Sequence, residues 1–227
     1  MPSEAPPVEV FEPAAPGPHP GVVVIHESYG VNDDIRRIAR RFADNGYVVA
    51  APDLLKGGPK LVCIMRAMRD LRSGRGPAVD ALEKVIADLE ARDDVTKVGV
   101  AGFCMGGGFA LLLATRGRIP VAGVYYGDTR PREELAKACP IVGGYGGKDR
   151  MFGEKGRKLI RTLDELGIEN DLKVYDDAGH SYMSEGAPFD TLAKLSRPLM
   201  HVQYNERAAE DSWPRMLAFF DRFLSAG

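Results

Sequence analysis

The sequence predicts a single α/β domain with a doubly wound, mostly parallel sheet and helices on both faces. Short apolar, β-branched runs alternate along the chain with segments of helical periodicity, which is the order of strands joined by crossover helices. Both faces of the expected strands are apolar, as in a parallel sheet covered on two sides. At 227 residues the chain has the length of one full-sized domain.

Six segments have the composition of buried strands. Each is short and apolar, and most are bounded by Gly, Pro, Asn or Asp. They are Gly21–Ile25, Tyr47–Ala51, Lys97–Phe103, Val121–Tyr126, Ile141–Gly144 and Asp171–Tyr175.

Apolar residues at helical spacing predict amphipathic helices between and after these strands. One runs from Asp33 to Asn45 and ends at an Asn-Gly pair, a common helix stop. Similar stripes extend from Val79 to Leu89 and from Trp213 to Leu224. We expect these helices to pack against the sheet.

Three stretches do not follow this alternation. Residues 1–20 contain seven of the sixteen prolines, so we expect an irregular lead-in with an edge strand at Val8–Phe11, and the main domain over residues 21–227. Leu54–Gly76, with its glycines and clustered arginines, and Ser181–Asn205 are expected to form substrate-facing loops or a small cap.

Composition and charge exclude several classes of partner. The chain is 44% hydrophobic and 27% charged, with a net charge of -2 and no basic stripe of the kind that nucleic acid requires. Its apolar runs are far shorter than the roughly 20 residues that cross a bilayer. The expected partner is a small molecule, and the expected assembly is a monomer or small homo-oligomer.

The N-terminus and the cysteines indicate the compartment. No basic residue precedes Arg36, so the chain lacks the charged start of a secretory signal, and we expect it in the cytoplasm. Three cysteines do not make a disulfide framework, and no Cys/His cluster has metal-ligand spacing. We therefore expect three thiols, with Cys63 and Cys139 as packing residues, and neither a metal nor a cofactor.

The strongest motif is Gly102-Phe103-Cys104-Met105-Gly106, between a predicted strand and the helical stretch Gly107–Thr115. This G-x-C-x-G pattern is typical of a nucleophile elbow, in which glycines two residues either side of the nucleophile permit a very tight turn. A thiol at a helix N-terminus is favoured as the thiolate. The alternative for Cys104 taken alone is a small buried hydrophobic residue.

An acid and a base follow the cysteine at the ends of two later strands. Asp149 comes after the strand at Ile141–Gly144, and His180 after the strand at Asp171–Tyr175. Parallel strands bring their carboxyl ends to one edge of the sheet. The order nucleophile, acid, histidine is that of an α/β-hydrolase, so we predict Cys104 as nucleophile, His180 as general base and Asp149 as its orienting acid.

The loop after the first buried strand supplies two further candidates. A tetrahedral oxyanion needs backbone N–H donors, for which we select Met105 in the elbow and Ser28 in this loop. Glu27 in the same loop opposes a thiolate electrostatically but can accept the thiol proton. Its alternative role is to cap the loop.

These motifs together resemble the dienelactone hydrolase family, from about Val22 to the C-terminal helix. The resemblance rests on the Cys104 elbow, Glu27, Pro52-Asp53-Leu54 and the contexts of Asp149 and His180. It implies a compact α/β-hydrolase that forms a cysteine acyl-enzyme from an activated ester or enol lactone. It also implies that Glu27 holds the resting thiol away from His180 and receives its proton.

One position departs from that family. Its members bind a substrate carboxylate with an arginine four residues after the catalytic histidine, where this chain has Ser184. Arg66 or Arg69 is a candidate for the second clamp residue, although both are equally interpretable as exposed helix charges. Tyr29 and Tyr182 flank the predicted site and are candidate substrate contacts.

Two other functions fit part of the pattern. An accessible thiol at a helix N-terminus also suits a redox sensor, but no resolving cysteine is evident. An inactive hydrolase-like protein that binds a ligand is the second alternative, which the altered clamp allows and the complete triad opposes.

Overall fold

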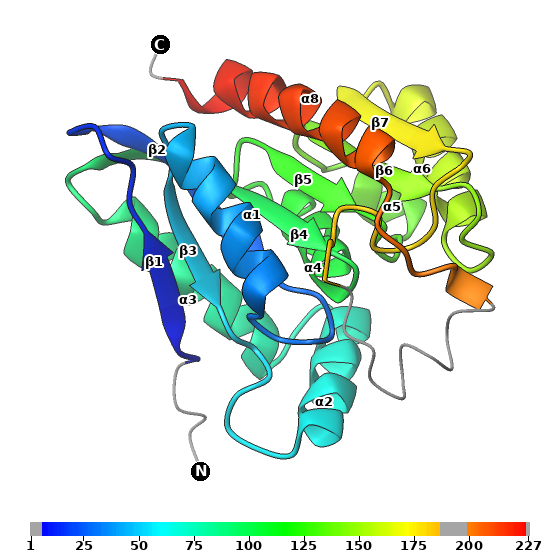
Figure 1. Ribbon diagram of the computed structural model, residues 1–227, viewed down its shortest axis with the longest axis horizontal. Coiled ribbons are helices and arrows are strands. Elements are labelled where there is room, and N and C mark those ends of the chain that lie inside the picture. Colours follow the sequence, from blue (N-terminus) through cyan, green and yellow to red (C-terminus); the bar gives the residue numbers. More distant parts are fainter. Residues whose placement is uncertain (1–5, 187–198, 226–227) are drawn as a thin grey trace.

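The computed structural model describes residues 6–186 and 199–225, over which seven strands form one sheet in the order β1-β3-β2-β4-β5-β6-β7 (Figure 1). β1 pairs with β3 in the antiparallel sense, and every other neighbouring pair is parallel. The strands are β1 (Val8–Phe11), β2 (His19–Ile25), β3 (Val48–Pro52), β4 (Val95–Phe103), β5 (Ala122–Tyr125), β6 (Ile141–Gly146) and β7 (Asn170–Tyr175).

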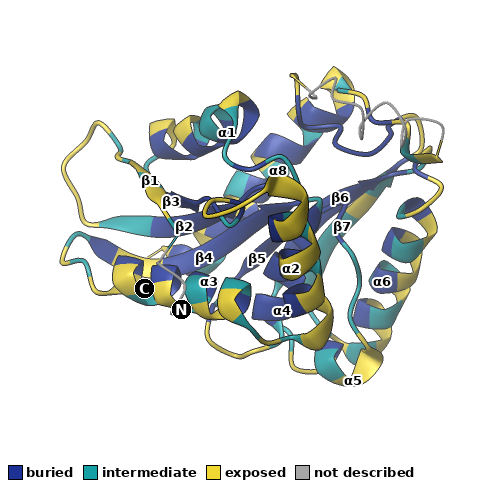
Figure 2. Cartoon of the chain, turned by 90° about the horizontal axis from the view of Figure 1, so that it is seen from below, coloured by how far each residue is buried: buried dark blue, intermediate teal, exposed yellow. Residues whose placement is uncertain are grey.

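Helices cover both faces of this sheet, as Figures 1 and 2 show. α1 and α8 lie on one face, while α3, α4 and α6 lie on the other, with α2 packed against α3 and α4. Their bounds are α1 (Asp33–Asp44), α2 (Lys60–Ser73), α3 (Pro77–Glu90), α4 (Met105–Ala114), α5 (Arg132–Leu135), α6 (Gly153–Leu166) and α8 (Glu206–Leu224). The doubly wound, mostly parallel α/β architecture is confirmed.

Each face of the sheet has its own hydrophobic core. Under α1 and α8, the Phe42 ring lies 5.4 Å from Trp213 and 5.8 Å from Phe220, between ring centroids. Phe109 and Leu111 of α4 lie in the opposite core and are fully buried. The strands between the two cores are the most buried part of the chain (Figure 2). The sheet is therefore a rigid base for the loops at its edges.

The predicted strands all form, with bounds within two residues of those expected. Leu54–Gly76, predicted as a substrate-facing loop or a small cap, contains the fourteen-residue helix α2, so the loop alternative is wrong and the cap stays a prediction. Its Cys63, Ala67 and Leu71 are buried against neighbouring helices, so tertiary packing stabilises a segment whose glycines lie outside the helix. Ser181–Asn205 lies partly outside the described residues.

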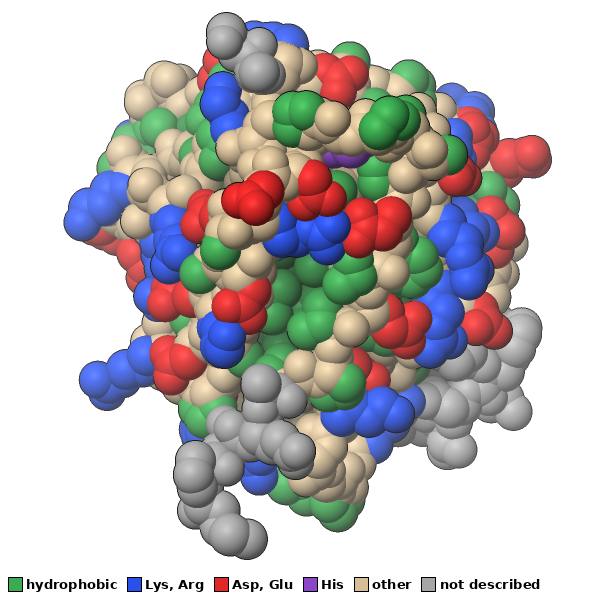
Figure 3. All heavy atoms as spheres, turned by 90° about the vertical axis from the view of Figure 1, so that its left-hand side faces the viewer, with side chains coloured by type: hydrophobic (Ala, Val, Ile, Leu, Met, Phe, Trp, Pro, Cys, Tyr) green, Lys and Arg blue, Asp and Glu red, His purple; other side chains and the backbone are tan. Residues whose placement is uncertain are grey.

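The β1 edge carries a shallow apolar groove. Figure 3 faces this side of the molecule and shows a hollow with a hydrophobic floor and charged side chains around it. A cavity of about 190 Å³ here is lined by residues of β1, β3 and α3, with Asp88 and Arg92 at its rim. Over the described residues, no helix is both long and apolar enough to cross a membrane.

Candidate active site

Cys104 lies in a strained turn between β4 and α4. Its backbone φ is 54° and ψ is -115°, a region that side-chain-bearing residues rarely adopt. A Cβ on Gly102 would lie 2.0 Å from the Gly106 carbonyl oxygen, and a Cβ on Gly106 would lie 2.1 Å from the Ile25 oxygen. Only glycine fits at both positions, so the G-x-C-x-G spacing is a requirement of the elbow. The thiol is half-buried, at the N-terminus of α4.

His180 and Asp149 meet where β6 and β7 end. The Asp149 Oδ2 atom lies 2.6 Å from His180 Nδ1. Its other oxygen accepts hydrogen bonds from the backbone N–H groups of Met151 and Phe152, at 2.9 and 3.1 Å. The carboxylate is thereby fixed in place, and it orients the imidazole so that Nε2 is the free nitrogen. Within the described residues this Nε2 atom makes no hydrogen bond.

The imidazole lies between two aromatic rings and is almost fully buried. Tyr126 and Phe152 each have a ring centroid 5.1 Å from that of His180. Burial lowers the pKa of His180, but the negative charges of Cys104 and Asp149 beside it outweigh this effect and raise the pKa to about 10. The histidine is therefore stabilised as the cation that a neighbouring thiolate requires.

Glu27 is a buried carboxyl beside these groups. Its side chain is 2% exposed, and its Oε1 atom accepts a hydrogen bond from the Ser184 hydroxyl at 3.1 Å. Burial raises the pKa of Glu27, while His180 and the hydroxyls of Ser181 and Ser184 act in the opposite direction. Ser184, the position at which an arginine was expected from the resemblance, thus contacts Glu27.

His26 fixes the backbone of the loop that carries Glu27. Its Nε2 atom accepts the Leu54 N–H at 2.9 Å, so its proton is on Nδ1, which donates to the Glu27 carbonyl oxygen at 2.5 Å. Burial lowers the pKa of His26 and keeps this ring neutral. The neutral ring of His26 thereby links the end of β3 to the loop that follows β2.

Comparison with known proteins gives the family. The sequence profile described as the dienelactone hydrolase family matches residues 7–224. This chain belongs to the dienelactone hydrolase family. It is thereby a carboxylic ester hydrolase of the α/β-hydrolase fold.

One curated relative and two solved structures illustrate the similarity in sequence and in fold. The chain is 29% identical to a carboxymethylenebutenolidase of Rhodococcus opacus, over 91% of this chain and 82% of that protein. It shares its fold with a dienelactone hydrolase-like promiscuous phosphotriesterase from metagenomic libraries, with a TM-score of 0.77 and 23% identity over 96% and 92% of the two chains. A ferulic acid esterase from Streptomyces cinnamoneus superposes with a TM-score of 0.65 and 21% identity, over 92% and 68%.

The two predicted oxyanion donors lie on adjoining segments of this hydrolase. Met105 is the first residue of α4, and Ser28 is in the loop after β2. The close approach of Gly106 to the carbonyl oxygens of Ile25 and His26 brings the elbow against the start of that loop. Their joint role at one oxyanion remains a prediction.

The candidate arginines lie on the outer surface of α2. Arg69 is exposed and forms an ion pair with Asp70 at 2.9 Å, and the other Asp70 oxygen accepts the Ala78 N–H at the start of α3. Arg66 is exposed beside a cavity of about 80 Å³ whose lining includes neither Cys104 nor His180. These contacts favour the interpretation as helix-surface charges.

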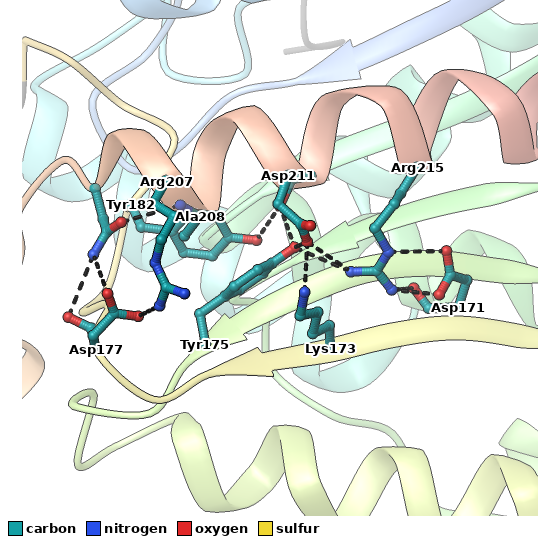
Figure 4. A network of polar contacts seen from close by, with 11 residues as sticks. Asp171, Lys173, Tyr175, Asp177, Tyr182, Arg207, Ala208, Asp211 and Arg215 are labelled. Atoms are coloured by element: carbon teal, nitrogen blue, oxygen red, sulfur yellow. Dashed lines mark hydrogen bonds and ion pairs between the residues drawn. The ribbon is translucent and has the colours of Figure 1, made fainter.

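The two candidate tyrosines differ in their surroundings. Tyr29 is half-buried, with the Lys60 ammonium 5.4 Å from its ring centroid, and its substrate contact stays a prediction. Tyr182 is fully buried, and its hydroxyl bonds to Ser212 Oγ at 2.9 Å beneath α8 (Figure 4). Tyr182 therefore anchors the histidine loop from behind, which disfavours a direct contact with substrate.

Two aromatic residues at the site were not among the sequence-predicted candidates. Phe152 packs on His180 from the start of α6, and Tyr126 packs on it from the end of β5. The rule that strand ends line the site identifies Tyr126 as a candidate, because β5 lies between β4 and β6.

Proposed function

We propose that this enzyme hydrolyses an activated carboxylic ester or enol lactone through an acyl-enzyme on Cys104. The observation that supports the proposal is the Asp149-oriented, buried His180 at the sheet edge where Cys104 occupies a strained elbow. A nucleophile, a base and an orienting acid in this order can perform acyl transfer in two steps.

In the first step, the Cys104 thiolate attacks the carbonyl carbon. The carbonyl oxygen becomes an oxyanion that the N–H groups of Met105 and Ser28 are suited to stabilise. When the tetrahedral intermediate collapses, the carbon–oxygen bond to the leaving group breaks, and His180 Nε2 donates its proton to the departing oxygen. A thioester on Cys104 remains.

In the second step, water attacks the thioester. His180 Nε2 accepts a proton from this water, and a second tetrahedral intermediate expels the Cys104 thiolate, releasing the carboxylic acid. The raised pKa of His180 supports the return to a thiolate and imidazolium pair. Glu27, with its raised pKa, is suited to exchange a proton with the resting thiol.

The nucleophile limits the class of substrate. A thiolate is a better leaving group than an alkoxide, so a tetrahedral intermediate on Cys104 returns to reactants unless the substrate also has a good leaving group. Enol lactones and aryl esters meet this requirement, whereas amides do not. The carboxymethylenebutenolidase relatives support an enol lactone as the natural type.

The expected cytoplasmic residence stays a prediction, and the state of the cysteines bears on the choice of a control variant. Cys63, Cys104 and Cys139 are all thiols. Burial raises the pKa of Cys139 to about 12, so that thiol is a poor nucleophile. Substitution of Cys139 is therefore a matched control for substitution of Cys104.

The test is hydrolysis of three compounds by the wild type, Cys104→Ala and Cys139→Ala. The compounds are an enol lactone with a carboxylate, the same lactone without it, and an aryl acetate. We expect turnover by the wild type and Cys139→Ala, and a loss of at least 10³-fold in Cys104→Ala, because the covalent route is removed. Equal turnover by all three proteins would contradict the mechanism.

A further inference from the structure

Tyr126 combines three features that its place in the fold does not require. Its ring is fully buried, its backbone φ is 40°, and its hydroxyl makes no hydrogen bond within the described residues. A buried hydroxyl without a partner costs about 1–3 kcal/mol relative to a bonded one. A strained backbone adds to this cost, and such costs persist mainly where function needs them.

The position of this residue puts the hydroxyl among the reacting groups. The Cys104 N–H bonds to the Tyr125 carbonyl oxygen at 3.0 Å, so the end of β5 is joined directly to the elbow. The Tyr126 ring packs on His180, and Cys104 contacts the same hydrophobic cluster. Two buried polar atoms without a described partner, His180 Nε2 and Tyr126 Oη, therefore belong to adjoining rings.

The surroundings show what kind of bond the hydroxyl can make. Burial raises the pKa of Tyr126 well above its usual value, and the nearby negative charges of Glu27 and Cys104 raise it further, whereas the neighbouring Ser184 hydroxyl acts in the opposite direction. The phenol therefore keeps its proton and acts as a donor. An anionic acceptor here would bring a further negative charge into a buried volume, which is unfavourable. An uncharged oxygen is the suitable acceptor.

We propose that the Tyr126 hydroxyl donates a hydrogen bond to an uncharged oxygen on the acyl part of the substrate. The proposal rests on the function proposed above and narrows its substrate class to esters or lactones with a neutral oxygen near the scissile carbonyl. For an open-chain ester, the acyl part is favoured over the leaving group because only the acyl part stays attached to Cys104 through both steps. Tyr126 is joined to the Cys104 elbow throughout.

The test uses two aryl esters whose acyl groups differ by one atom. In 4-nitrophenyl methoxyacetate an ether oxygen replaces a CH₂ group of 4-nitrophenyl butyrate, while the leaving group is the same. The ratio of their kcat/KM values is compared between the wild type and Tyr126→Phe, so that the intrinsic reactivities cancel. We expect this ratio to fall about tenfold in Tyr126→Phe, because only the methoxyacetyl group loses a hydrogen bond.

A second buried tyrosine is the matched control. The Tyr145 hydroxyl also lacks a hydrogen bond within the described residues, but its side chain lies in the opposite core, against Gly156 of α6. Tyr145→Phe should leave the ratio unchanged. The Cys104 alkylation rate and the thermal midpoint report whether Tyr126→Phe keeps the wild-type fold.

Pre-steady-state kinetics separate the acyl part from the leaving group. The deacylation rate constant is measured after 4-nitrophenol has departed, so an effect of Tyr126→Phe on the methoxyacetyl to butyryl ratio in this step can arise only from the acyl part. We expect the ratio to fall in deacylation as well. A ratio unchanged within twofold in both steps would show that the hydroxyl is structural or bonds only to water, and would overturn the inference.

The wild type alone tests the preference for neutral groups. We expect 4-nitrophenyl hydrogen glutarate to be hydrolysed at least tenfold more slowly than its methyl ester, after subtraction of the non-enzymatic rate. Faster hydrolysis of the charged ester would overturn the expected preference for uncharged acyl groups. Absence of any Cys104-dependent turnover would reject the proposed function and the inference together, whereas Cys104-dependent turnover with an unchanged ratio would reject only the inference.

Discussion

Glu27 has a buried carboxyl group whose Oε1 atom accepts a hydrogen bond from the Ser184 hydroxyl. Burial raises its pKa above the value of 4.5 expected in the unfolded chain. Below pH 4.5 the group is protonated in both states. As the pH rises through the window between 4.5 and the folded pKa, the unfolded chain loses this proton first, so the fold loses stability.

Glu27→Gln removes this titration and should gain stability relative to the wild type as the pH rises from 4.5. The difference in unfolding free energy, measured by urea denaturation at several pH values, should be smallest near pH 4 and increase until the folded pKa is passed. Glu133→Gln, at an exposed position on α5, should show no such trend. A difference that shrinks as the pH rises would contradict the burial argument.

The individual site residues that could be predicted are those marked by their immediate sequence neighbours. Cys104 is marked by glycines that the elbow requires, and Asp149 and His180 by their places after apolar runs. The structure pairs Asp149 with His180 at 2.6 Å, and the catalytic roles of the three residues stay a prediction. The lack of a partner for the Tyr126 hydroxyl could not be predicted, because it depends on residues from segments far apart in the sequence.

Among the elements, α8 and β7 are joined by a polar network around the Tyr175 hydroxyl (Figure 4). This hydroxyl accepts hydrogen bonds from Ser212 and Arg215, at 2.9 and 3.0 Å, and donates to Asp211 at 2.8 Å. Ser212 in turn contacts Tyr182, two residues beyond His180. The network connects the C-terminal helix to the loop that carries His180.

Tyr175→Phe should therefore destabilise the protein by about 2 kcal/mol, because it leaves the buried Ser212 with one partner fewer. It should also lower kcat more than it raises KM, since the histidine loop loses part of its support. Glu169→Gln, which breaks the exposed Glu169–Arg222 pair between the same elements, should change both quantities little. Urea denaturation and steady-state kinetics of the two variants provide the comparison, and equal losses would show that the network has no special role.

Elements with strong periodicity were predicted well, and elements that depend on packing were not. α1 combines an Asn32 cap, a clear apolar face and an Asn-Gly stop, all visible in the sequence. α2 has no side-chain cap and carries arginines among its apolar residues, so the contacts with α3 and α4 decide its structure. α6 contains Gly153 and Gly156, which weaken the helical signal, yet Gly156 is required for contact with Tyr145.

Over the whole molecule, backbone strain is concentrated in loops at or near the candidate site. The non-glycine residues with positive φ in the described ranges are Cys104, Tyr126, Ser181 and His201. His180, next to Ser181, bonds through its N–H to Met200, next to His201. The two cores hold the sheet rigid, so the strained loops do not relax independently. The fold thus loses stability where the chemistry requires fixed geometry.

The strain at Cys104 can be measured by comparing the stabilities of two variants at this position. At a φ of 54°, glycine is favoured over alanine by about 1 kcal/mol, so Cys104→Gly should be more stable than Cys104→Ala, with a thermal midpoint about 3 °C higher. Cys63 lies inside α2, where glycine is disfavoured by a similar amount, so Cys63→Gly should be less stable than Cys63→Ala. Calorimetry of the four variants tests this reversal of sign. If glycine were the less stable choice at both positions, the elbow would carry no strain, and the low stability of the site would have another origin.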